Sequence, residues 1–136
     1  MTELQREANR RFGYTAQETL SAAQSLYETH KLLTYPRTDS RYLSDDMKGE
    51  ITDLLQKMAA VYPEGQPFIA GLLEEGPNLD KRVVNTSKVT DHHAIIVTNR
   101  IHTYQPKRLS QKENNILRLV MTRFIVALSA KKVYDE

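Results

Sequence analysis

Residues 110–128 read SQKENNILRLVMTRFIVAL and predict the clearest helix of the chain. Ser110 is a typical N-cap residue, and Glu113 follows at the spacing that closes a capping box. The apolar residues that would form a buried face recur every three or four positions: Leu117, Val120, Phe124 and Leu128. Lys131 and Lys132 follow the helix at its negative end, where the macrodipole favours cations.

Two short helices are predicted near the N-terminus, over residues 4–12 and from residue 15 to about residue 30. Each has a capping-box pair at its start: Thr2 with Gln5, and Thr15 with Glu18. Gly13 ends the first helix and lies in the tight turn between the two. Two helices joined in this way form a helix-turn-helix pattern, which small helical bundles share.

A further helix is predicted over residues 44–61, capped by Ser44 and ended by Pro63. Residues 65–108 are rich in Pro, Gly and Asn and are expected to form a long loop region. Within it, the β-branched stretch 95–98 predicts one short strand, and a second is considered over 82–86. The expected fold class is therefore mainly α with a small β ribbon.

Composition limits the function classes. With 136 residues, the chain is expected to form a single domain, residues 1–136. It has no cysteine, which excludes disulfides and thiolate chemistry. No apolar run reaches the ~20 residues of a membrane span, and no signal-peptide core is present. We expect a cytoplasmic protein.

Charge is distributed unevenly along the chain. Residues 1–42, 43–80 and 81–136 carry net charges of +1, −6 and +7 within a total of +2. A basic last third suits a face that meets an anion such as nucleic acid. The alternative is that both charged regions are ordinary solvated helix faces.

The densest group of reactive side chains is LTYPRTDSR, residues 33–41. Pro36 favours an extended Tyr35, so Tyr35, Arg37 and Asp39 would project to one side. A guanidinium beside a phenol favours the phenolate and can hold a phosphate oxygen as charge develops. These residues suit phosphoryl transfer to a tyrosine. The alternative is a capped turn in which Asp39 and Ser40 satisfy backbone donors and Tyr35 half-buries its ring.

A second group is DHHAII, residues 91–96. Adjacent histidines on an extended chain point in opposite directions, so His92 and His93 make a poor metal site. One of them can instead donate a hydrogen bond to a phosphate. The alternative is one packed and one exposed histidine. His30 and His102 have no partners in sequence and are predicted to lie on the surface.

Three blocks together resemble the type IA DNA topoisomerases, most closely the bacterial topoisomerase III branch. They are LQREANRRFGY (4–14) with AAQSLY (22–27), LTYPRTDS (33–40), and HHAII (92–96). The second block is similar to the family's active-site tyrosine motif. The resemblance implies a small domain related to winged-helix, catabolite-activator-like folds.

The resemblance also implies residue roles. Tyr35 matches the nucleophile, Arg37 the arginine at the scissile phosphate, His92 a histidine near that phosphate, and His93 the second histidine of this branch. Beyond these catalytic candidates, DNA contacts are expected from His93, Thr38, Ser40 and Arg41. Val97 departs from the family, which usually has proline there.

The implied reaction is transient cleavage of single-stranded DNA through a 5′-phosphotyrosine link, strand passage and religation without ATP. In the family, Mg²⁺ and a catalytic lysine belong to a separate Toprim domain, for which this chain has no room; no metal site is expected within it. We therefore expect an inactive fragment of an isomerase that works with its other domains on DNA at the bacterial nucleoid.

Two other functions stay open. One is a helix-turn-helix module that binds duplex DNA without chemistry, although the second predicted helix carries Glu18 and Glu28 ahead of Lys31, few charges for a recognition helix. The other is a non-catalytic helical interaction module.

Overall fold

The computed structural model describes residues 2–38, 40, 42–77, 79, 83–89 and 92–129. It contains five α-helices: α1 (Thr2–Phe12), α2 (Ala16–Glu28), α3 (Ile51–Val61), α4 (Gln66–Glu75) and α5 (Gln111–Ser129). Short 3₁₀ segments lie between them, at Asp45–Glu50, Pro63–Gly65, Thr86–Lys88, Asn99–Thr103 and Pro106–Arg108. The mainly α prediction is confirmed.

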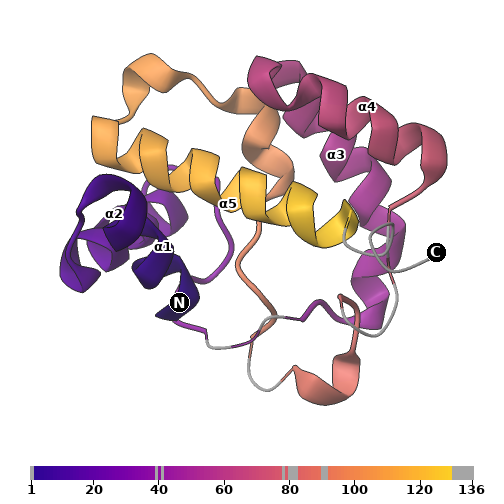
Figure 1. Cartoon of the computed structure of the whole chain (residues 1–136), viewed down its shortest axis with the longest axis horizontal. Helices are drawn as coiled ribbons and strands as arrows, with labels where there is room; N and C mark the ends of the chain where they lie inside the picture. The colour runs from indigo at the N-terminus through magenta and orange to yellow at the C-terminus, as the bar shows by residue number, and fades with distance from the viewer. Residues whose placement is uncertain are drawn as a thin grey trace.

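Helix α5 runs across the molecule and organises the core (Figure 1). Helices α1 and α2 pack against it at one end, and α4 packs against it at the other, with α3 behind α4. Because partners cover α5 on more than one side, its buried set is wider than the single predicted face. The buried residues of α5 are Ile116, Leu117, Leu119, Val120, Met121, Phe124, Ile125 and Leu128.

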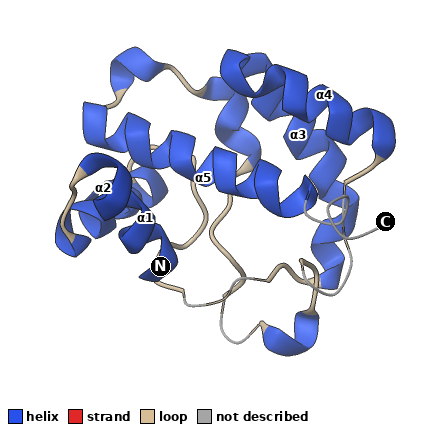
Figure 2. Ribbon diagram, in the orientation of Figure 1, coloured by secondary structure: helices blue, strands red, loops and turns tan. Residues whose placement is uncertain are grey.

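The predicted β ribbon is not formed among the described residues, where Figure 2 shows loops in place of strands. Only two isolated bridges occur, Leu33 with Val97 (antiparallel) and Leu43 with Val84 (parallel). Each β-branched stretch meets its partner at one residue, so pairing does not extend into a ladder. Arg82, in the second predicted strand, lies outside the described residues.

Two helix predictions need correction. The segment predicted as one helix from residue 44 begins as the 3₁₀ turn Asp45–Glu50, and Ser44 bonds the Asp46 side chain instead of capping the backbone. Gly49, a poor helix former, lies in that turn. Helix α4 was predicted as loop, although it carries the signals of a helix: Pro67 in its first turn and Gly76 at its end, with a φ of 88°.

The N-terminal capping prediction is also wrong. Thr2 lies inside α1, and the Gln5 side chain donates to the Ala16 carbonyl at 3.0 Å instead of reaching back to Thr2. This hydrogen bond joins α1 to the first turn of α2.

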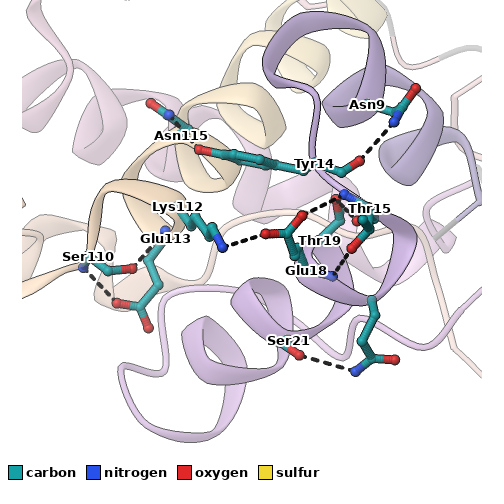
Figure 3. A network of polar contacts seen from close by, with 11 residues as sticks. Asn9, Tyr14, Thr15, Glu18, Thr19, Ser21, Ser110, Lys112, Glu113 and Asn115 are labelled. Atoms are coloured by element: carbon teal, nitrogen blue, oxygen red, sulfur yellow. Dashed lines mark hydrogen bonds and ion pairs between the residues drawn. The ribbon is translucent and has the colours of Figure 1, made fainter.

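Both other capping boxes are confirmed, and they also connect α2 to α5 (Figure 3). Glu18 accepts from the Thr15 amide through Oε1 at 2.8 Å and from Lys112 Nζ of α5 through Oε2 at 2.5 Å. Glu18 therefore uses one carboxylate oxygen for its own helix and the other for the partner helix, and Glu113 does the same.

Glu113 accepts from the Ser110 amide through Oε1 at 2.8 Å and from Ser25 Oγ of α2 through Oε2 at 2.5 Å. His30 Nε2 lies 3.3 Å from the same Oε2 and is half-buried, so the prediction of a surface histidine without a partner is wrong. His102 is exposed, as predicted. Burial raises the pKa of Glu113, but the Ser25 and Ser110 hydrogen bonds and the His30 charge outweigh it and lower the pKa.

The Glu18–Lys112 pair predicts a pH-dependent stability. The Lys112 hydrogen bond, with that of the Thr15 amide, lowers the pKa of Glu18 from 4.5 to about 2. A depressed carboxyl pKa stabilises the fold above pH 4.5, and the contribution is lost as pH falls from there towards 2. We expect Glu18→Gln to lower Tm at neutral pH and to lower it much less as the pH approaches 2.

Glutamine preserves the capping hydrogen bond, so the measured loss reports the charge. Glu50→Gln is the matched control, because Glu50 is exposed and its side chain makes no capping hydrogen bond. This variant should leave Tm unchanged at both pH values. A Glu18→Gln effect that is equal at both ends of the pH range would contradict the pairing.

Candidate active site

The tyrosine segment is fastened to the histidine segment by backbone hydrogen bonds. The Thr34 amide donates to the Ile96 carbonyl and the Thr98 amide to the Leu32 carbonyl, both at 2.9 Å. The Thr34 hydroxyl adds two bonds to the same residue, accepting from the Ile96 amide at 3.0 Å and donating to its carbonyl at 3.2 Å. Thr34 therefore sets the register in which Tyr35 meets the segment that carries His92.

The Tyr35 ring contacts two other rings. The His92 ring is 4.1 Å away between centroids and inclined by 34°, and the Tyr27 ring of α2 is 5.5 Å away in an edge-to-face arrangement at 79°. Tyr35 is half-buried and His92 is exposed. These two aromatic contacts restrict the ring, so the structure joins the two predicted groups at one place.

Thr38 and Ser40 support the same loop. Thr38 is only 5% exposed; its hydroxyl donates to the His92 carbonyl at 3.2 Å and accepts from the Ser40 amide at 3.1 Å. Ser40 Oγ accepts from the Tyr42 amide at 3.1 Å, and the Ala94 amide donates to the Tyr42 carbonyl at 2.9 Å. The hydroxyl pair thus holds the chain around His92. The capped turn considered above is present in part, so the geometry suits both interpretations.

The remaining site candidates differ in exposure. Arg37 is exposed, and no ion pair or hydrogen bond joins it to another described residue. His93 is half-buried, with Nδ1 2.7 Å from the Ala94 carbonyl oxygen, whereas His92 is exposed, so the two histidines differ in environment as expected. Asp39 and Arg41 lie outside the described residues.

The backbone position of Val97 could be occupied by a proline without loss of a bridge hydrogen bond. In the bridge between Leu33 and Val97, the two hydrogen bonds use the amides of Thr34 and Thr98, not that of Val97. A proline here would remove no donor from the bridge. The departure from the family pattern therefore leaves this pairing intact.

A groove of about 830 Å³ lies beside the site between α1, α5 and the loops that carry Ser40 and Ala94. Arg11 and Arg123 in its walls pair with carboxylates of α1, while Arg6 is exposed. Sequence reasoning missed this groove because its walls come from distant parts of the chain, and no local pattern marks it.

No three His, Asp or Glu side chains of the described residues gather closely enough to hold a metal ion.

Comparison with protein families shows that the chain belongs to the DNA topoisomerase family, whose sequence pattern matches residues 1–136. Over all 136 residues it is 46% identical to a protein of Bacillus licheniformis named DNA topoisomerase 3. The proteins of the same name from Bacillus subtilis and Bacillus cereus are 45% and 44% identical. The chain spans 18% of the length of each of these relatives. The predicted resemblance to the topoisomerase III branch is confirmed.

Among the described helices, none combines the length and apolar character needed to cross a bilayer.

The Thr34 hydroxyl is expected to stabilise the site. Thr34→Val keeps the side-chain shape but leaves the part-buried Ile96 amide without its acceptor. The expected loss is about 1–3 kcal/mol in the free energy of unfolding, measured by urea denaturation. Thr52→Val, at an exposed position of α3, is the control and should change it by about 0.5 kcal/mol or less. Equal losses in the two variants would show that the Thr34 side chain does not fasten the segments.

Proposed function

We propose that this chain supplies the nucleophile of a type IA DNA topoisomerase of the topoisomerase III branch. The observation that carries the proposal is the half-buried Tyr35 ring held against His92, two residues from the exposed Arg37, which pairs with no other described residue. A tyrosine fixed by its neighbours suits attack on a phosphodiester.

In the proposed reaction, Tyr35 Oη attacks a phosphorus of single-stranded DNA. The bond to the 3′ oxygen breaks, a 5′-phosphotyrosine link forms, and a free 3′-hydroxyl leaves. After another strand has passed, that hydroxyl attacks the link and restores both the DNA and the phenol. One phosphodiester replaces another at each step, so no ATP is required.

The other residues act on charge. The Arg37 guanidinium can hold a non-bridging oxygen of the phosphate while negative charge develops there. His92 lies against the Tyr35 ring and can donate a hydrogen bond to the same phosphate. His93, Thr38, Ser40 and Arg41 are proposed to contact DNA or to position those that do.

The proposal extends to the rest of the enzyme. Mg²⁺ would be bound by a Toprim domain outside these 136 residues, so this chain alone would not relax DNA. Its partners would be single-stranded DNA and the remaining domains, in the bacterial cytoplasm at the nucleoid. A winged-helix relationship of the fold is part of the same proposal.

The nucleophile is tested by trapping the adduct. Full-length protein containing this chain is mixed with Mg²⁺ and a single-stranded oligonucleotide labelled at its 3′ end, then quenched with denaturant. A 5′-phosphotyrosine link keeps the labelled 3′ portion on the protein. We expect mass spectrometry to find it on the peptide containing Tyr35, and Tyr35→Phe to abolish it.

Tyr27→Phe is the matched control, because it removes a hydroxyl from the neighbouring ring and keeps the edge-to-face contact. It should retain the adduct. An adduct on another residue would refute the site assignment. Absence of any adduct, with strand binding intact, would favour the non-catalytic DNA-binding module.

Arg37 is expected to act mainly in the transition state. In the full-length protein, Arg37→Ala should slow single-turnover cleavage about 100-fold or more, while weakening strand binding less than tenfold, because the charge it meets develops during the reaction. Arg10→Ala, an exposed arginine of α1, is the control and should change neither. Equal losses of cleavage and binding would mean that Arg37 only holds the DNA.

A further inference from the structure

A second pocket, of about 370 Å³, lies at the end of α2, between that helix and the 3₁₀ turns of residues 99–108. Its polar lining is Thr29, His30, Arg100, Thr103, Gln105 and Arg108. None of these residues belongs to the tyrosine motif or to the other sequence blocks that carry the family resemblance. The pocket is a separate place on the molecule where two arginines converge.

The pocket has an excess of positive charge. No described aspartate or glutamate lines it, and the sequence of residues 99–112 contains neither residue type. Arg100 and Arg108 are exposed, and neither forms an ion pair with a described residue. By contrast, Arg10 and Arg123 on the helices pair with carboxylates. Unpaired guanidiniums in a concave site are suited to an anion from outside.

The acidic groups near the pocket already have other hydrogen-bond partners. Glu113 contacts His30 at 3.3 Å, but its oxygens also accept from Ser25 and from the Ser110 amide. Glu28, at the end of α2, accepts from Gln24 through its side chain. The arginines therefore have no competing internal partner among these residues.

The turns that carry the arginines are fastened in place. Thr98 Oγ1 donates to the Lys31 carbonyl at 2.6 Å and accepts from the Arg100 amide at 3.3 Å. On the other side, the Arg108 amide donates to the Gln105 carbonyl at 3.0 Å, and Asn114 of α5 donates to the Pro106 carbonyl at 3.0 Å. Both backbones are thus positioned before any ligand binds, which lowers the entropic cost of binding.

The pocket is also close to the tyrosine along the chain. Leu32 lines it, and Tyr35 follows three residues later, so their Cα atoms are at most about 11 Å apart. Nucleotides of one strand are spaced by about 3.4 Å along the axis in duplex DNA. A strand held in the pocket would reach Tyr35 within a few nucleotides.

We propose that this pocket binds a backbone phosphate of single-stranded DNA, with Arg100 and Arg108 as its ligands, a few nucleotides from the phosphate that Tyr35 attacks. This inference rests on the proposed function for the identity of the strand. The two guanidiniums supply forked donors that match phosphate oxygens. The contact positions the strand and takes no part in bond breaking.

The test measures binding without cleavage. Full-length protein carrying Tyr35→Phe is titrated with a fluorescent single-stranded oligonucleotide at several salt concentrations. Adding Arg100→Gln and Arg108→Gln should weaken binding several-fold. It should also reduce the slope of log K against log salt by about 0.7, because one phosphate contact is lost. Arg100→Lys with Arg108→Lys should restore most of the slope.

The control pair is Lys48→Gln with Lys57→Gln, which removes the same net charge from the acidic segment of the chain. It should leave the slope unchanged, and circular dichroism checks that both pairs fold. An unchanged slope in the arginine pair, or equal losses in both pairs, would overturn the proposal. The proposal would also be overturned if the arginine pair lost inorganic phosphate binding, measured by NMR, but kept its oligonucleotide binding. The pocket would then bind only free anions.

These outcomes are separate from the adduct experiment. If Tyr35 forms no adduct but the arginine slope falls, the phosphate pocket stands and the nucleophile assignment fails. If the adduct forms and the slope does not change, the nucleophile assignment stands and the phosphate pocket fails.

Discussion

The hydrogen bonds between Thr34 and Ile96 are the constraint on which the site depends. Three bonds join these two residues, and they bring together segments that lie 62 positions apart. Neither segment has regular secondary structure of its own to fix it. Once Thr34 is held, Tyr35 meets His92, and Thr38 closes the loop by bonding the His92 carbonyl. Side-chain hydroxyls therefore help to hold these two segments together, as the backbone hydrogen bonds of a β-sheet would in another fold.

The helices supply the support for that loop. Tyr27, on α2, also packs against Tyr35, so the position of the Tyr35 ring depends on where α2 lies. The two capping carboxylates fix α2 against α5, because each also binds the partner helix. His30, at the end of α2, joins this network and also lines the phosphate pocket. The proposed nucleophile and the pocket thus both depend on the position of α2.

Sequence patterns predicted the parts that local physical chemistry determines. The boxes at Thr15 and Ser110 marked the starts of α2 and α5 correctly, because capping is decided within four residues. The resemblance brought Tyr35 and His92 to one site, although their packing distance needed the structure. The sequence pattern does not reveal α4, because Pro and Gly are common in loops, whereas here they mark the two ends of a helix.

What remained hidden depends on contacts across the chain. The partner of His30 is 83 positions away, and the two arginines of the pocket converge on α2 only after folding. The ribbon was overpredicted because β-branched residues indicate an extended chain but not how far it pairs.

The central claim is that the Thr34–Ile96 pairing holds the Tyr35 ring in contact with the rings of His92 and Tyr27. It is tested most directly by nuclear Overhauser effects among the three rings in the 136-residue chain. The account predicts cross-peaks from the Tyr35 ring protons to both other rings, and their marked weakening in Thr34→Val. Absence of these cross-peaks in a folded chain, or full retention of them in Thr34→Val, would contradict it.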